Sequence, residues 1–327
     1  MAKQRESHAM PSLTPADYAE LLDVETMGYQ RRTESFYPPE TDRMPITEQR
    51  TIYAALCQAF HHPYPDHVRA RDERLGDVAC RFYQSDRPAA GDVTVLYLHG
   101  GGFVMGNLES HDSICAEICG QTGLRLVSAD YRLAPEYLHP AQFDDCLSVL
   151  RAIAARWPHG SILIAGDSAG ASLGAALCHH ARRDRALRIC GQVMIYPMLL
   201  LDIDTKSCRT HAQAPALSTE AVDYYNRVRS PDGTLPHGDT RYFPLADHDF
   251  SGLPPTVIFT AECDPLVDDG PAYCNKLSAA GGKALLREEK GLIHGYLRAR
   301  HSVARAAASF TDITATISAL AQGRFPE

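Results

Sequence analysis

The stretch SILIAGDSAGASLGAA, at residues 161–176, decides the fold. Its first five residues form a continuous apolar run, which predicts a buried β-strand, and its last residues are small enough for a helix packed closely on a sheet. Between them, Gly166, Ser168 and Gly170 fit the pattern G-x-S-x-G. That pattern is typical of a sharp strand-to-helix turn that raises a serine hydroxyl above the sheet. The sequence therefore favours a nucleophilic Ser168 over a glycine-rich turn with an incidental serine.

Short apolar runs like the one before Ser168 recur along the chain. They are VTVLYL, RLVSA, QVMIY, TVIFT and ALLRE, at residues 93–98, 125–129, 192–196, 256–260 and 284–288. An alternating run, VACRFY, precedes them at residues 78–83, and helix-like segments separate most of them, at residues 111–122, 141–157 and 171–184. Strands that are apolar on both faces and alternate with helices predict an α/β fold with a mostly parallel central sheet.

The N-terminal region has a different pattern. Residues 1–13 carry no regular apolar spacing and are expected to be frayed, whereas Thr14, Pro15 and Asp17 mark the start of a helix. A second helix carries an apolar stripe made of Ile52, Ala55, Leu56, Ala59 and Phe60. Residues 1–75 are therefore expected to form a helical segment apart from the sheet.

A second interruption falls late in the chain. Residues 200–240 are polar and contain prolines, with one helix expected at STEAVDYYNRVRS, residues 218–230. We expect this insertion and the N-terminal helices to form a second layer over the carboxyl edge of the sheet. The domain that carries the sheet then spans residues 76–327.

Composition and charge exclude several classes of protein. The chain has 40 acidic residues against 32 Lys and Arg, a formal charge of −8, which argues against nucleic acid or an anionic membrane as the main partner. The opening MAKQRESHAM lacks a signal-like apolar segment, and no run is long enough to span a membrane. The sequence therefore predicts a soluble, cytoplasmic protein. Its ten scattered cysteines form no CxxC pair, which favours reduced, buried thiols and no metal site.

The stretch LYLHGGGFVMGN, at residues 96–107, supplies a second chemical signal. Acyl transfer from an ester requires preorganised N–H groups for the oxyanion of the tetrahedral intermediate. Gly100, Gly101 and Gly102 follow an apolar strand, where a side-chain-free backbone can approach a substrate closely. The N–H of Ala169, after the nucleophile, is the other expected donor. An ordinary glycine-rich turn would leave the match to two separate motifs unexplained.

A nucleophilic serine also needs a base and a group that orients the base. The order of such groups in this type of fold is Ser, then an acid, then His. Asp264 follows the strand TVIFT, and its rivals Asp268 and Asp269 lie where the next helix is expected to start. His294 follows the last strand in a loop, and the weaker candidate His301 is expected in a helix.

The set HGGGF, DYRLAPE, GDSAG, ECDPLVDD and HGY resembles the hormone-sensitive-lipase-like family of α/β-hydrolases, and bacterial acetyl esterases and short-chain carboxylesterases within it. The resemblance runs from about residue 75 to 320. It implies a triad of Ser168, Asp264 and His294, oxyanion donors from the glycine loop and Ala169, and a cap from the N-terminal helices and the insertion. DYRLAPE, at residues 130–136, is expected to be a supporting ion-pair loop.

The function expected from these residues is hydrolysis of short-chain acyl esters through an acyl-enzyme, with a small-molecule ester as substrate and no cofactor. Amide or N-acetyl hydrolysis on the same residues is an alternative. A second alternative is a non-catalytic ligand-binding protein, because plant gibberellin receptors resemble this family without a working triad. The presence of His294 favours turnover. The resemblance is also compatible with a homodimer.

Overall fold

The fold is built on one central β-sheet. The computed structural model describes residues 12–199 and 202–326, which contain an eight-stranded sheet in the order β1-β2-β4-β3-β5-β6-β7-β8. The pairs β1–β2 and β2–β4 are antiparallel, and every later pair in that order is parallel. The α/β prediction is therefore confirmed. The strands are β1 (Val68–Leu75), β2 (Val78–Ser85), β3 (Val93–Leu98), β4 (Arg125–Asp130), β5 (Ser161–Asp167), β6 (Ile189–Ile195), β7 (Thr256–Cys263) and β8 (Ala284–Ile293).

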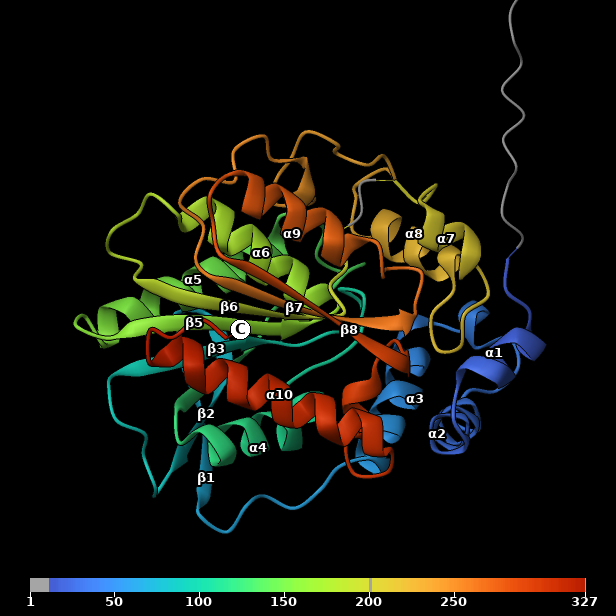
Figure 1. The fold of residues 1–327 in the computed structure, drawn as a ribbon, viewed down its shortest axis with the longest axis horizontal. Helices are drawn as coiled ribbons and strands as arrows, with labels where there is room; N and C mark the ends of the chain where they lie inside the picture. The colour runs from blue at the N-terminus through green and yellow to red at the C-terminus, as the bar shows by residue number, and fades with distance from the viewer. Residues whose placement is uncertain (1–11, 200–201, 327) are drawn as a thin grey trace, which may run out of the picture.

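Helices cover both faces of the sheet and gather at one of its ends (Figure 1). Helices α5, α6 and α9 pack on one face, and α4 and α10 pack on the other. Helices α1, α2, α3, α7 and α8 lie toward the end to which the parallel strands point (Figure 1). The helices are α1 (Pro15–Leu21), α2 (Val24–Glu34), α3 (Ile46–Ala59), α4 (Asp112–Thr122), α5 (Ala141–Arg156), α6 (Ala169–Ala181), α7 (Lys206–Thr210), α8 (Thr219–Val228), α9 (Asp269–Ala279) and α10 (Ala304–Ala321). Short 3-10 turns are η1 (Thr41–Arg43), η2 (Glu109–His111), η3 (Pro244–Ala246) and η4 (Tyr296–Ala299).

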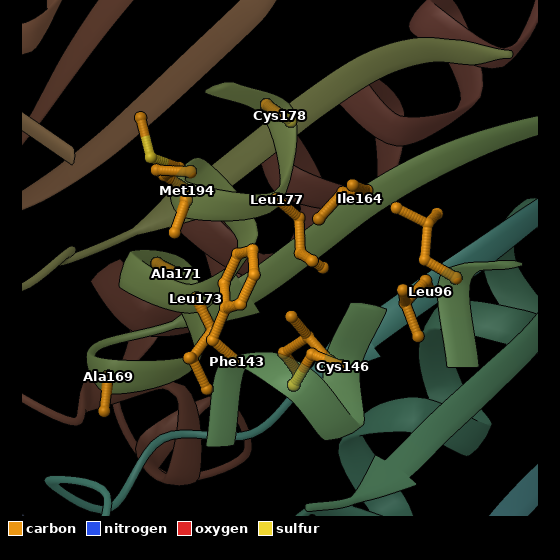
Figure 2. Close-up of a cluster of buried hydrophobic side chains, with 14 of the residues drawn as sticks. Leu96, Phe143, Cys146, Ile164, Ala169, Ala171, Leu173, Leu177, Cys178 and Met194 are labelled. Carbon is orange, nitrogen blue, oxygen red and sulfur yellow. The ribbon is translucent and has the colours of Figure 1, made fainter. Parts of the chain in front are cut away.

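Two hydrophobic cores hold these layers together. Successive strand residues point to opposite faces, so a fully buried strand serves both cores. In β3, Leu96 belongs to the core under α5 and α6, whereas Tyr97 belongs to the core under α4 and α10. Figure 2 shows Leu96 in the same cluster as Phe143 of α5 and Leu177 of α6. Each such side chain contributes about 1.5–3 kcal/mol on burial.

The N-terminal helices begin as the sequence predicts. The Thr14 hydroxyl accepts a hydrogen bond from the Asp17 N–H, and the Asp17 carboxylate accepts one from the Thr14 N–H at 2.7 Å. This reciprocal pair satisfies two donors at the helix start. Leu56 of α3 and Phe60, directly after the helix, are buried, but Ala55 is exposed, so the apolar stripe is narrower than expected. The expected fraying of residues 1–13 falls largely outside the described residues.

Three local predictions are corrected by the structure. Strand β1 was not predicted, because its sequence VRARDERL is charged and its side chains are largely exposed at the edge of the sheet. The helix expected at residues 171–184 is α6, Ala169–Ala181, so it begins earlier than expected, directly after the predicted nucleophile. His301 lies in the turn between η4 and α10 rather than in a helix, with its Nε2 at 3.0 Å from Glu117 of α4.

Two predictions about composition can also be compared with the structure. All ten cysteines are free thiols, and each is buried or partly buried, which confirms that they act as small apolar side chains. Within residues 12–199 and 202–326, no helix is both long enough and apolar enough to cross a membrane.

Candidate active site

The turn between β5 and α6 carries Ser168. Its backbone has φ 50° and ψ −120°, a conformation that L-residues rarely adopt and that costs of the order of 1–3 kcal/mol. The turn lies so close to the end of β3 that a Cβ on Gly170 would be 1.9 Å from the carbonyl oxygen of Leu98. Only glycine fits there. The strained turn raises the Ser168 side chain beyond the end of the strand.

His294 and Asp264 reach Ser168 from two neighbouring strands. His294 directly follows β8, and its Nε2 lies 2.9 Å from the Ser168 Oγ. Asp264 directly follows β7, and its Oδ2 lies 2.6 Å from the Nδ1 of His294. Parallel strands end at one edge of the sheet, which is why residues 126 and 30 positions apart meet here. The structure therefore brings together the three residues selected from the sequence.

The rival candidates have other partners. The Asp268 carboxylate accepts a hydrogen bond from the Ser207 N–H, and the Asp269 carboxylate accepts one from the Leu199 N–H. His301 pairs with Glu117, a buried residue of α4. In the described structure none of the three forms a hydrogen bond with Ser168 or His294.

The glycine loop after β3 supplies unpaired N–H groups beside the serine. Among the described residues, the N–H groups of Gly101, Gly102 and Ala169 have no hydrogen-bond partner. The N–H of Gly100 is different, because it donates to Oδ1 of Asp167 at 3.0 Å. Gly100 therefore holds the loop in place, and the expectation that it offers a free donor is corrected.

Asp167, the residue before the serine, joins the two loops. Besides the Gly100 bond, its Oδ1 accepts from the Tyr97 hydroxyl at 2.9 Å, and its Oδ2 lies 3.3 Å from Nε2 of His111. The carboxylate is 2% exposed. Burial by itself raises its pKa, but the charge of His111 and these hydrogen bonds outweigh burial and hold the pKa of Asp167 well below its usual range. The carboxylate is therefore ionised, and a charged acceptor forms the stronger bond to the loop.

His99 anchors the same loop from its other side. Its Nδ1 lies 2.9 Å from the Gly100 carbonyl oxygen, its ring stacks on Tyr131 at 4.3 Å, and its carbonyl oxygen accepts from the Tyr131 hydroxyl. Burial, followed by the nearby His111, lowers the pKa of His99 to about 4. His99 is therefore neutral at pH 7, and as a neutral ring it can donate from Nδ1 to the carbonyl.

The DYRLAPE loop pairs with two separate helices. Arg132 forms an ion pair with Asp145 of α5 at 2.7 Å, and Glu136 forms one with Arg50 of α3 at 2.8 Å. Arg50 also donates to the Val104 carbonyl oxygen, just past the glycine loop. These contacts connect the loop, α3 and the segment that carries the glycines.

Sequence reasoning missed the partners of the central residues. Asp167 occupies a variable position of the G-x-S-x-G motif, so the motif alone does not predict that its carboxylate accepts the Gly100 N–H. Tyr97, His111 and Tyr196 were also missed. The Tyr196 ring lies 4.7 Å from the His294 ring, and its hydroxyl points at Asp167. Tyrosine and histidine in strands and turns are common, so their pattern alone predicts no such cluster.

Two further features lie outside this cluster. A cavity of about 700 Å³ is lined by residues of α8 and the loops around it, including Asn226, His237 and Asp247, and by none of Ser168, Asp264 and His294. Within the described ranges, no group of three or more His, Cys, Asp or Glu side chains is placed to hold a metal ion.

Known proteins resemble this chain in sequence and in fold. The chain matches the model of the α/β-hydrolase fold over residues 95–298. It is 32% identical over 274 residues to the carboxylic ester hydrolase LipN of Mycobacterium tuberculosis, across 77% of this chain and 70% of LipN. It is 33% identical over 221 residues to an ethyl acetate hydrolase of Pseudomonas putida, across 65% of this chain and 69% of that protein. A solved structure described as a bacterial heroin esterase has a TM-score of 0.83 at 27% identity, across 94% of this chain and 99% of that one.

The chain therefore belongs to the α/β-hydrolase fold family. Within that family it is an ester hydrolase of the hormone-sensitive-lipase-like carboxylesterase group, as the resemblance of its motifs implied.

Proposed function

We propose that this protein hydrolyses short-chain carboxylic esters through a Ser168–His294–Asp264 triad. The observation that carries the proposal is the continuous chain of contacts, 2.9 Å from the serine oxygen to one imidazole nitrogen and 2.6 Å from the other nitrogen to the carboxylate. A base within hydrogen-bond reach of a nucleophile, itself oriented by an acid, is the arrangement that activates a serine.

The reaction proceeds by two acyl transfers. The Ser168 Oγ attacks the ester carbonyl carbon while His294 Nε2 takes the hydroxyl proton, and the carbonyl π electrons move to oxygen. When the tetrahedral intermediate collapses, the carbon–oxygen bond to the alcohol breaks and His294 returns the proton to the leaving oxygen. Water then attacks the acyl-serine with the same histidine as base, which releases the carboxylic acid and restores Ser168. Asp264 stabilises the positive imidazole in both steps.

The negative oxygen needs stabilisation during each step. We assign this role to the N–H groups of Gly101, Gly102 and Ala169, which are unpaired in the described structure. Loss of one such donor typically costs about 3–4 kcal/mol of barrier. The Asp167–Gly100 bond holds the loop in this position before substrate binds.

The proposed preference for short acyl groups is supported by the side chains that lie beside the glycine loop. We propose that α1–α3 and the segment containing α7 and α8 form a cap over the site. The Tyr225 ring of α8 lies so close to Gly102 that a Cβ there would be 2.4 Å from its Cδ1. Tyr225 packs with Val104, Met105 and Val228 in a small apolar cluster. Little room is then left beside the loop for a long acyl chain.

A rate series tests both parts of the proposal. Nitrophenyl acetate, butyrate, hexanoate, octanoate and dodecanoate are compared on the wild-type protein and on Ser168→Ala. We expect the highest kcat/KM at acetate or butyrate and loss of hydrolysis in Ser168→Ala. A maximum beyond octanoate contradicts the short-chain assignment, and full activity of Ser168→Ala contradicts the triad. A matched nitroanilide separates ester from amide preference.

A further inference from the structure

Arg298 lies in η4, a single turn after His294, and its guanidinium points toward the N-terminal helices. Its Nη2 donates to the Tyr53 hydroxyl and contacts the Cys57 Sγ at 3.4 Å, both from α3. Its Nη1 lies 3.9 Å from the position of a Cβ on Gly295, the residue after His294. The charged group therefore lies between the loop that carries His294 and helix α3.

The charge of Arg298 has no carboxylate partner in the part of the chain that the structure describes. Its Nε is enclosed without a hydrogen-bond partner, and its Nη1 makes no hydrogen bond to a described residue. A partly buried cation with no carboxylate in direct contact keeps hydrogen-bonding capacity that the protein does not use. The Nη1 of Arg298 is therefore a candidate anion-binding group.

Two other buried arginines can be compared with Arg298. Arg300, two residues later, donates to both carboxylate oxygens of Glu117 and is 4% exposed. Arg229, which is 2% exposed, is enclosed between the rings of Phe103 and Tyr242, at 3.7 and 3.5 Å from its Cζ. Its Nη2 donates to the Tyr242 carbonyl oxygen, and its Nε is enclosed without a hydrogen-bond partner, like that of Arg298. Arg298 is held by the Tyr53 ring on one side, at 5.0 Å, and is partly exposed.

The surroundings of Arg298 connect it to the catalytic centre. The Tyr29 hydroxyl donates to the Gly295 carbonyl oxygen at 3.0 Å, which fixes the backbone between His294 and Arg298. The guanidinium is near enough to Asp167 to be one of the charges that lower the pKa of that carboxylate. Tyr37, 39% exposed, lies within electrostatic range of both Arg298 and Tyr225, the ring over Gly102. Arg298 therefore lies between α3 and the loop that carries His294.

We propose that Arg298, assisted by Tyr53, binds a free carboxylate on the substrate, so that the preferred esters are acidic. This inference rests on the proposed esterase function and names its substrate class. A guanidinium presents N–H donors in a planar fork that matches a carboxylate. The Tyr53 hydroxyl accepts its bond from Arg298, so its own proton stays free to donate to the same anion. A local cation also offsets the repulsion between an anionic ester and a chain of net charge −8.

Paired substrates measure this preference. The nitrophenyl hemiester of glutaric acid carries the carboxylate on its acyl part. Its neutral match is the nitrophenyl methyl diester, in which that carboxylate is methylated. Butyryl 4-hydroxybenzoate, compared with its methyl ester, places the carboxylate on the leaving alcohol instead. The measured quantity is the ratio of kcat/KM for the acidic ester to that for the neutral ester. This ratio is independent of the fraction of protein that is folded.

The variants are Arg298→Gln, Arg298→Lys and Tyr53→Phe, with Arg300→Gln as the matched control. The wild-type ratio is expected to exceed one for at least one pair. Arg298→Gln lowers that ratio about ten- to one-hundredfold, the usual value of a charged hydrogen bond. Arg298→Lys gives an intermediate ratio, and Tyr53→Phe a smaller loss. Arg300→Gln leaves the ratio unchanged even where it lowers stability, because Glu117 and not the substrate takes its charge.

A binding measurement adds a second readout. Glutarate is titrated into the Ser168→Ala protein, and binding is expected to weaken when Arg298→Gln is added. The inference is overturned if wild type and Arg298→Gln have the same ratio of acidic to neutral ester hydrolysis and glutarate does not bind. Hydrolysis of the neutral esters in that case leaves the esterase proposal intact. Absence of hydrolysis of every ester by the wild-type protein overturns the proposed function instead.

Discussion

The N–H of Gly100 donates to Oδ1 of Asp167 at 3.0 Å, and this bond joins the loop after β3 to the turn after β5. The proposed nucleophile and the proposed oxyanion donors are thereby fixed relative to each other before a substrate arrives. Preorganisation of this kind is effective because no reorganisation is needed as negative charge develops. The residue beside the nucleophile is therefore as much a part of the geometry as the triad.

Asp167→Asn is expected to lower kcat about tenfold or more with little change in KM. The amide keeps the shape of the carboxylate but loses its charge toward His111 and Gly100, so the oxyanion donors move from their position. Loss of an interaction that acts in the transition state lowers kcat rather than substrate binding. Asp247→Asn, which removes a carboxylate paired with His179 and Arg182, serves as a control and should leave kcat unchanged.

His99 is expected to make stability depend on pH between about 4 and about 6.5. Its pKa is lowered to about 4 in the folded protein, mainly by burial, against about 6.5 in an unfolded chain. In this window the unfolded chain binds more protons, so stability rises with pH by up to about 3 kcal/mol. Urea unfolding across this range should show a shallower pH dependence for His99→Asn. Equal slopes for the two proteins would contradict the assignment.

Tyr225→Ala is expected to move the acyl preference toward longer chains. Removal of the ring beside Gly102 opens space next to the oxyanion loop. The ratio of octanoate to butyrate hydrolysis should rise at least about tenfold, since each added methylene that fits an apolar pocket is worth about 1–3 kcal/mol. Tyr224→Ala, at a neighbouring position that is 45% exposed, is the matched control and should leave the ratio as it is.

Phe143→Ala is expected to destabilise the protein by about 3–5 kcal/mol, since the core cannot close over the space that the ring leaves. The ring is 1% exposed and lies between α5 and the sheet (Figure 2). Denaturant unfolding measures the change. Leu21→Ala, at a side chain that is 40% exposed, should cost less than about 0.5 kcal/mol.

The sequence allowed most of the sheet to be predicted and the three residues of the proposed triad to be selected, because both leave local signals. Ser168 follows a continuous apolar strand and lies between glycines, and Asp264 and His294 each come directly after an apolar strand. Strand β1 left no such signal, since at the edge of the sheet its charged side chains stay in water. Its pattern therefore resembles that of a loop.

Contacts between distant segments could not be predicted. Arg298 meets Tyr53 across 245 positions of the chain, and His111 meets Asp167 across 56. No spacing in the sequence encodes either pair, because each depends on how helices pack around the end of the sheet. The hydrogen bond from the Gly100 N–H to Asp167 could not be predicted for the same reason, because the sequence shows three glycines in a row with nothing to distinguish them.

Covalent labelling tests the proposed nucleophile most directly. The protein is treated with a fluorophosphonate, and the modified residue is located by mass spectrometry of its peptides. The account predicts one adduct, on Ser168, that is absent from Ser168→Ala and forms much more slowly in His294→Ala. An unlabelled Ser168 in protein that hydrolyses nitrophenyl acetate would contradict the account.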